Sequence, residues 1–377
     1  MSVRAFAAHL GMAVASVSNW EQRGERIRLR DETQEILDRD LSQASDHVCA
    51  RFEAALGGAS DTLRSDEDRR LAHVMAYPGR ADLATVEYLR EKVAELDAEY
   101  DHAPSASLLG NAGQRHGQIA FLLTHTGDSR MQRELLAASA ESATLMGQLV
   151  WDASLRRDHA AALSYFDSAV QVADACGDRV AACRAQLRRS YVALYGQRNP
   201  VVGLEMAAQA ASTGRMASNV LAGLALLHVA EAHAMQGHTQ PCEEALSTAN
   251  SYFANIDDAD EAVSLFTPVD LSRMAGSCYL HLDDAPKAVI FLTDTLRNAG
   301  QTKAAAVAAA NLALAYAHQE KIDEAVISLH QAIDIIDATR GGGGLTVAFT
   351  AGRALNPWRD SKTVQHVHDR LLALMAA

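Results

Sequence analysis

The stretch Asp158–Ala173, DHAAALSYFDSAVQVA, decides the fold. Within it a small residue, Ala162, is followed after four positions by Phe166 and after three more by Ala169. These spacings place the three side chains on one face of an α-helix. Small side chains at fixed positions on that face allow a second helix to approach closely. The stretch therefore predicts a helix that packs tightly against a neighbouring helix.

The same pattern recurs four more times along the chain. The copies are Gly203/Ala207/Ala210, Cys242/Leu246/Ala249, Ala288/Leu292/Thr295 and Ala325/Leu329/Ala332, and their first residues are spaced by 41, 39, 46 and 37 positions. Each copy follows another amphipathic segment, at 145–155, 184–195, 221–235, 271–280 and 304–317. A pair of helices cannot bury its apolar face alone, so successive pairs stack. We expect an all-α chain with an α-solenoid of helical pairs.

This repetition resembles the tetratricopeptide-repeat family in degenerate form, over about residues 143–340. In the last three copies a further small residue stands twelve positions before the first one, at Ala230, Gly276 and Ala313. The repeat spacing is longer than the roughly 34 residues of an ideal tetratricopeptide repeat. Residues 67–142 are also expected to be helical and to add one or two pairs. The predicted repeat domain is therefore 67–340.

The C-terminal segment 341–377 is predicted to cap the repeats. It begins with four glycines at 341–344, which we interpret as a flexible break rather than a phosphate-binding loop, because no strand precedes them. Helices are expected at 345–355 and 363–375, with Val364, Val367 and Leu371 on the apolar face of the second.

The N-terminal segment 2–24, SVRAFAAHLGMAVASVSNWEQRG, predicts two short helices separated by a turn at Gly11. It resembles the lambda-repressor-like (XRE/Cro-type) helix-turn-helix family, because Phe6-Ala7, Leu10-Gly11, Val17-Ser18 and Trp20-Glu21 fall where that family has its inter-helix core and acidic partner. The family has another helix before this pair, and Ala13 stands where a Ser or Thr cap is usual. The alternative interpretation is an ordinary helical hairpin that packs on the body.

The resemblance implies double-stranded DNA as a partner and the second helix as the element that enters the major groove. The expected DNA-contacting residues are the outward ones of that helix: Val14, Ala15, Ser18, Asn19, Gln22 and Arg23. Residues 1–30 carry a net charge of +3, from five Arg and two Glu, so the remainder carries -16 of the total of -13. We therefore expect contact with a polyanion at one end of the chain only.

The predicted N-terminal module covers residues 1–56, because an apolar stripe continues through 31–56. Residues 57–66, which begin Gly57-Gly58, are the predicted linker. The whole arrangement resembles actinobacterial regulators that join such a motif to a body of helical repeats. The segments LDAEYDHAPSASLL (96–109) and ALNPWRD (354–360) carry that likeness.

The predicted function is a DNA-binding transcriptional regulator whose repeat domain senses a peptide, a small molecule or a protein partner. The alternative is a repeat scaffold for protein interactions whose helix-turn-helix is a relic. The first helices of the pairs form the concave face of a solenoid. We transfer the groove-facing positions of tetratricopeptide repeats to the first helices of this chain. They give these candidate groove residues: Trp151, Arg188, Tyr195, Glu231, Arg273 and Asn311.

Several classes of function find no support in the sequence. The five cysteines form no CxxC pair and the fifteen histidines no HExxH, so no metal site is predicted. The motifs of nucleophilic catalysis, phosphate loops and dinucleotide binding are absent, so we expect neither an enzyme nor a cofactor. No apolar run approaches the roughly 20 residues of a membrane span. We expect a cytoplasmic protein that forms a homodimer, since one short reading helix gives little affinity.

Overall fold

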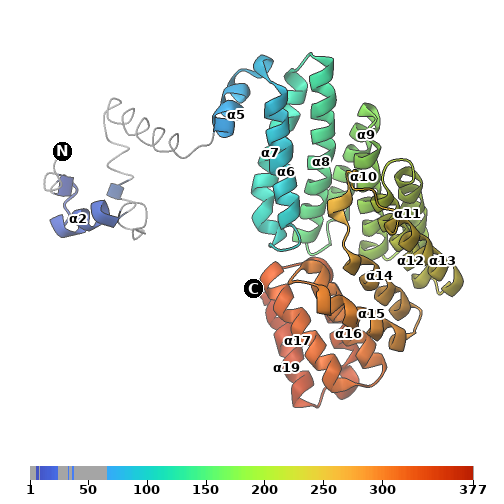
Figure 1. Ribbon diagram of the computed structural model, residues 1–377. Helices are drawn as coiled ribbons and strands as arrows, with labels where there is room; N and C mark the ends of the chain where they lie inside the picture. The colour runs from blue at the N-terminus through green and yellow to red at the C-terminus, as the bar shows by residue number, and fades with distance from the viewer. Residues whose placement is uncertain (1–5, 8, 24–32, 34–35, 38–65, 377) are drawn as a thin grey trace. The chain divides into compact units, whose positions relative to one another are not determined.

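The computed structural model describes the chain except for residues 1–5, 8, 24–32, 34–35, 38–65 and 377 (Figure 1). The chain divides into two compact units, Met1–Ala72 and His73–Ala377. The regular structure of the described residues is entirely helical, which confirms the predicted all-α class. The predicted limits of the module at 1–56 and of the linker at 57–66 lie mostly outside the described residues and stay predictions, as does the helix at 31–56.

In the first unit, a tight turn connects two helical segments. Gly11 has a φ of +66°, and the Met12 amide donates to the Ala7 carbonyl at 2.8 Å, so the first segment ends in a Schellman motif. Helix α2 (Val14–Arg23) follows. Ala7 and Val17 are buried, with 0% and 6% exposure. Of the predicted pair, the described residues contain the second helix, and before the turn they give Phe6, Ala7 and His9 as helical, so the first helix stays a prediction.

In the second unit, helices follow one another with short connections. Helix α5 (Asp66–Ala76) lies across the boundary between the units. The others are α6 (Leu83–Glu99), α7 (Ser105–His125), α8 (Ser129–Ala153), α9 (His159–Cys176), α10 (Arg179–Tyr191), α11 (Pro200–Gly214), α12 (Asn219–Met235), α13 (Thr239–Phe253), α14 (Pro268–His281), α15 (Ala285–Asn298), α16 (Lys303–His318), α17 (Ile322–Thr339), α18 (Gly342–Ala354) and α19 (Lys362–Ala376). Short turns lie between some of them: η2 (Pro78–Arg80), η3 (Val192–Gly196), η4 (Val263–Leu265) and η5 (Asn356–Trp358).

Capping side chains and glycines next to the helix ends set many of these boundaries. The Asp158 carboxylate accepts a hydrogen bond from the Ala161 amide at the start of α9, and Asp178 and Asp284 cap α10 and α15 in the same way. Helix α9 ends at Gly177, whose φ of +78° suits a residue without a side chain. These caps make each two-helix unit compact and its connections short.

The recurring small-residue pattern occupies the second helix of successive pairs, α9, α11, α13, α15 and α17, and every member of it is buried. A side chain at Gly276 would lie 2.6 Å from Cγ of Leu292, which is a member of the copy on α15. The tight packing predicted from the spacing is confirmed, and the repeats form an α-solenoid.

Even-numbered helices form the inner layer of the repeats. From α6 to α18 each even-numbered helix contacts the next even-numbered one, in addition to its own partner (Figure 1). We call the surface formed by α6, α8, α10, α12, α14 and α16 the inner face. The helix that precedes the first copy begins at Ser129, earlier than the sequence indicated.

The prediction of a flexible break at 341–344 was wrong. Gly342–Gly344 form the first turn of α18, and all three residues are buried. A side chain at Gly342 would lie 3.0 Å from Cα of Leu155, and one at Gly344 would lie 2.9 Å from Cβ of Ala306. The glycines are there because the backbone of α18 approaches two other segments closely. The predicted capping helices at the C-terminus are present as α18 and α19.

None of the helices in the described part of the chain has both the length and the apolar character that crossing a membrane requires.

Candidate ligand-binding face

A cleft of about 800 Å³ opens between α6, α8 and α10 on the inner face. Its volume falls in the range of small-molecule sites. Its walls combine apolar side chains with both signs of charge, namely Leu83, Val86, Glu87, Arg90, Glu91, Val93, Ala94, Asp97, Arg130, Glu134, Glu141, Leu145 and Arg184. Arg90 pairs with Glu141 at 2.5 Å, and Arg184 pairs with Asp97.

Further along the inner face, four side chains from α12, α14 and the π-helical turn η3 form what we call the polar network: Tyr195, His228, Glu231 and Ser277. The Tyr195 hydroxyl lies 2.6 Å from Nδ1 of His228 and also donates to Glu231. The Ser277 hydroxyl donates to the other carboxylate oxygen of Glu231 at 2.5 Å. Glu231 is 3% exposed, so these contacts stand in for its lost hydration.

The electrostatics of the polar network follow from burial and from the single carboxylate at its centre. Burial opposes ionisation of Glu231, but its contacts with His228 and Ser277, and the charge of His281, outweigh burial and lower its pKa to about 2. Burial, together with the neighbouring carboxylate, raises the pKa of Tyr195 well above its usual value. Burial lowers the pKa of His228. Glu231 is therefore an anion and Tyr195 a donor at neutral pH.

Two arginines and a second tyrosine lie next to the polar network. The Arg188 guanidinium lies over the ring of Tyr191 at 5.2 Å, and the Tyr191 ring lies 4.2 Å from that of His228. Arg273 pairs with Asp270 at 3.2 Å, and its Nε has no hydrogen-bond partner among the described residues. Arg188 follows the cleft residue Arg184 by one turn of α10.

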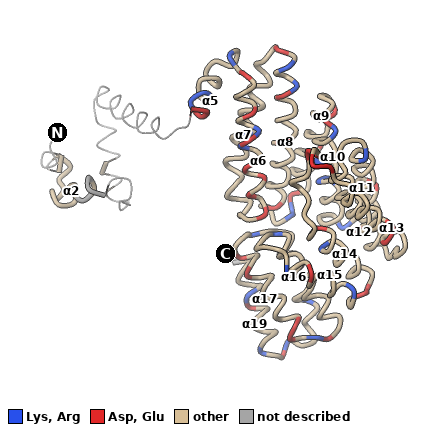
Figure 2. The backbone as a smooth tube through the Cα atoms, viewed as in Figure 1, with Lys and Arg blue, Asp and Glu red and all other residues tan. Residues whose placement is uncertain are grey.

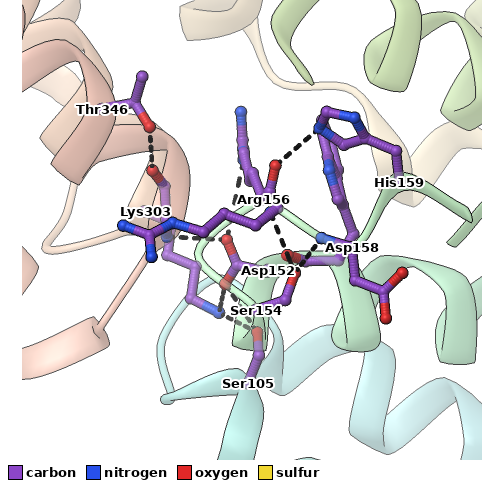
Figure 3. Close-up of polar contacts among 11 residues, drawn as sticks. Ser105, Asp152, Ser154, Arg156, Asp158, His159, Lys303 and Thr346 are labelled. Carbon is purple, nitrogen blue, oxygen red and sulfur yellow. Dashed lines mark hydrogen bonds and ion pairs between the residues drawn. The ribbon is translucent and has the colours of Figure 1, made fainter. Parts of the chain in front are cut away.

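At one end of the inner face, five residues from distant parts of the sequence form what we call the closure cluster: Asp101, Ser105, Asp152, Lys303 and Gly342. Figure 3 labels three of them, Ser105, Asp152 and Lys303. Lys303 Nζ lies 2.9 Å from Oδ2 of Asp152 and donates to Ser105 at 2.7 Å. The Lys303 amide donates to the Asp101 carbonyl at 2.9 Å, and the Gly342 amide donates to Oδ1 of Asp152 at 2.9 Å. The first turns of α16 and α18 are thereby joined to α7 and the end of α8.

The closure cluster is buried and constrained. Asp152 is 1% exposed and Lys303 is 6% exposed. Burial lowers the pKa of Lys303, and the charge of Asp152 opposes that shift. The adjoining residues Leu155 and Arg156 have φ values of 54° and 61°, a conformation that L-residues adopt only at a cost. Contacts to the C-terminal helices stabilise this turn, since Leu155 packs against their core.

Four of the six predicted groove residues lie along this face: Arg188, Tyr195, Glu231 and Arg273 surround or belong to the polar network. Trp151 lies deeper, 4% exposed, under the Arg156 guanidinium at 4.7 Å, and its Nε1 has no hydrogen-bond partner among the described residues. Asn311 is 7% exposed on α16 and makes none of the contacts of the polar network.

Sequence reasoning missed Tyr191, His228 and Ser277. Each stands three or four positions from a predicted residue on the same helix: Tyr191 after Arg188, His228 before Glu231, and Ser277 after Arg273. That spacing places side chains on one face of a helix, so it was the signal available. It was not decisive, because aromatic and small residues at helical spacing more often form core.

The predicted DNA-contacting residues lie on α2 in the first unit. Val14 is 43% exposed, Ala15 is exposed and Ser18 is partly buried. Asn19, Gln22 and Arg23 belong to the same helix, but their side chains lie outside the described part. No three His, Cys, Asp or Glu side chains of the described residues are grouped to hold a metal ion.

The chain matches no protein-family model and no curated protein sequence. Among solved structures, the crystal structure of aspartyl phosphate phosphatase F from Bacillus subtilis is similar, with 14% identity and a TM-score of 0.40 over 85% of this chain and 80% of that chain.

Proposed function

We propose that the protein is a DNA-binding transcriptional regulator. The helix pair around Gly11 contacts double-stranded DNA, and the inner face of the repeats binds an effector, which is a peptide, a small molecule or a protein partner. The proposal also includes a cytoplasmic location, a homodimer and the absence of catalytic activity.

One observation supports the DNA-binding part most directly. On α2, Val17 is buried, whereas Val14 and Ala15, at the N-terminal end of the helix, are exposed. A recognition helix reads bases with the outward residues of its first turns, and small apolar side chains there can contact a thymine methyl group. Helix α2 therefore has a buried side and an exposed side, as the proposed role requires.

The distribution of charge supports DNA contact at the N-terminal end of the chain only. Residues 1–30 carry +3 and the rest carry -16. On the described body, acidic and basic positions are interspersed along the helices rather than separated by sign (Figure 2). Such a surface does not attract a polyanion, so DNA contact is assigned to the N-terminal module.

The effector part of the proposal is supported by the inner face. It combines a cleft of about 800 Å³ with a buried polar network of four side chains from three elements. Buried polar networks cost free energy unless every member is satisfied, so they are common at functional sites.

The test is DNA capture and titration with the full chain. We expect enrichment of a defined sequence, with Arg23→Ala weakening binding to every duplex and reducing the salt slope by about one unit. Asn19→Ala should instead relax the preference at one base pair, by about 1–3 kcal/mol. Arg359→Ala, which removes the same charge from an exposed site on the body, is the control and should change neither.

The alternative is a scaffold for protein partners with a relic helix-turn-helix. Ala13 precedes α2 and offers no side-chain cap, which favours a weakened module. If the folded full chain shows the same weak affinity for every duplex, and the variants do not differ from it, the scaffold replaces the regulator.

A further inference from the structure

The cleft between α6, α8 and α10 has more negative than positive groups in its lining. It is lined by five carboxylates and three arginines: Glu87, Glu91, Asp97, Glu134, Glu141, Arg90, Arg130 and Arg184. Apolar side chains lie among them, and three of these are buried, namely Val86, Val93 and Leu145. A cleft of this composition is complementary to a ligand that joins a positive charge to an apolar part.

The cleft already holds guanidinium groups that belong to the protein. Arg90 on α6 donates from Nε and Nη2 to the two carboxylate oxygens of Glu141 on α8, at 3.0 and 2.5 Å. Its Nη1 lies 3.6 Å from Glu134. Arg184 on α10 pairs with Asp97 on α6. The contacts of Arg90 show that a carboxylate of this cleft can receive a guanidinium group in the paired arrangement that suits it best.

The electrostatic potential in this cleft favours positive charge. The hydrogen bonds with Glu141 and the charges of Glu141, Glu134 and Asp178 raise the pKa of Arg90, in spite of its burial. Asp178 caps α10 and adds a negative group beyond the lining itself. A ligand cation in the cleft gains from the same carboxylates, and the apolar side chains of the lining reduce the screening by water.

Two carboxylates of the lining are not used by the protein's own cations. Glu87 and Glu91 stand one turn apart on α6, both are exposed, and neither takes part in an ion pair with a described residue. Lys92, the neighbour of Glu91, pairs with Glu95 instead. Arg130 is the one arginine of the lining that has no ion pair among the described residues, so one positive group stands against two negative ones. The lining therefore has a pair of acceptors left for an added cation.

We propose that the cleft between α6, α8 and α10 binds an organic cation, an ammonium or a guanidinium group attached to an apolar part. Glu87 and Glu91 accept the hydrogen bonds of the cation, and the apolar part packs against Val86, Val93 and Leu145. This site gives a chemical class to the effector and therefore rests on the proposed function.

The experiment measures the melting temperature of the full chain at constant ionic strength. Phenethylamine and the tripeptide acetyl-Leu-Arg-Leu-amide carry a cation and an apolar part, and phenethyl alcohol and acetyl-Leu-Gln-Leu-amide are their neutral counterparts. At up to about 50 mM, we expect a saturable rise of about 2–3 °C with at least one charged probe and none with its neutral counterpart. A response to the amine alone reports a small-molecule cation, and a response to the peptide alone reports an arginine side chain.

The variant Glu87→Gln/Glu91→Gln separates the two acceptors from a general effect of charge. Each substitution keeps the shape of an exposed side chain that makes no ion pair, so without a probe the variant should melt within about 1 °C of the unsubstituted chain. Its affinity for the charged probe should fall at least about tenfold, because charge-assisted hydrogen bonds are lost. Glu99→Gln/Glu205→Gln is the matched control: it removes the same charge from exposed positions outside the cleft and should keep the full rise.

Four results would each overturn the cation site: no rise with either charged probe, an equal rise with the neutral counterpart, an unchanged rise in Glu87→Gln/Glu91→Gln, or an equal loss in the control variant. DNA titration of the same samples keeps the two proposals apart. If the folded chain binds no DNA sequence specifically but responds to the cation, the regulator is removed and the site stays. The reverse pattern removes only the site.

Discussion

At the scale of single residues, Glu231 organises the inner face. It accepts hydrogen bonds from Tyr195 and Ser277, which reach it from two other elements. One buried carboxylate therefore connects η3, α12 and α14, and its ionisation is coupled to their packing.

Acid should weaken the fold through Glu231. Its pKa is about 2 in the folded protein against an ordinary value of 4.5, so its stabilisation is complete above pH 4.5 and is lost as the pH falls towards 2. Between pH 6 and pH 3 the loss from this group is about 2 kcal/mol. Urea unfolding over that range should show a smaller pH dependence for Glu231→Gln than for the unsubstituted chain, and parallel curves would contradict it.

Part of this site could be predicted from the sequence. The repeat spacing indicates which turns of the first helices face inward, and Arg188, Tyr195, Glu231 and Arg273 lie in or beside the polar network there. That they bind an effector stays a prediction. The spacing could not predict which of them would be paired. The partner of Arg184 is Asp97 on another repeat, and the partner of Glu231 is Ser277 two helices later. Such pairings depend on the relative placement of helices, which no local pattern specifies.

At the scale of elements, the fold depends on small residues where helices approach closely. The recurring triads predicted this because they are periodic and local. The role of Gly342–Gly344 could not be predicted, since the atoms that they approach belong to residues far away in the sequence. When the sequence does not show which atoms a run of glycines approaches, the run is more typical of a linker.

Gly276→Ala tests the close approach of α14 and α15. The added methyl group would lie 2.6 Å from Cγ and 3.3 Å from the backbone nitrogen of Leu292, a residue with 0% exposure. We expect a loss of about 1–3 kcal/mol in the free energy of unfolding. Gly117→Ala on α7 is the control, because no atom lies within 4 Å of its added methyl group. It should stabilise the protein by about 0.5–1 kcal/mol, and equal effects at the two sites would be inconsistent with the packing.

At the scale of the whole repeat unit, the closure cluster joins the beginning of the repeats to their end. Ser105 and Lys303 are 198 positions apart, and Asp152 and Gly342 are 190 apart. The ion pair within it is buried, so each partner is costly without the other.

Lys303→Met should destabilise the repeats by about 3–5 kcal/mol in urea unfolding, because Asp152 then stays buried without its main counter-charge. Hydrogen exchange at the Gly342 amide should also accelerate. The double variant Lys303→Met/Asp152→Leu should recover part of the loss; the rest remains because the Gly342 amide loses its acceptor. Arg370→Met is the control: it breaks an exposed pair with Asp334 and should cost about 0–1 kcal/mol. A loss of that small size for Lys303→Met would contradict the role of the cluster.

Repeat arrays usually gain or lose copies easily in evolution, because each unit touches only its neighbours. Here Lys303 and Gly342, near the end of the array, both contact Asp152 near its beginning. A duplicated or deleted copy would carry those residues away from Asp152, so the number of copies in this chain is fixed by geometry.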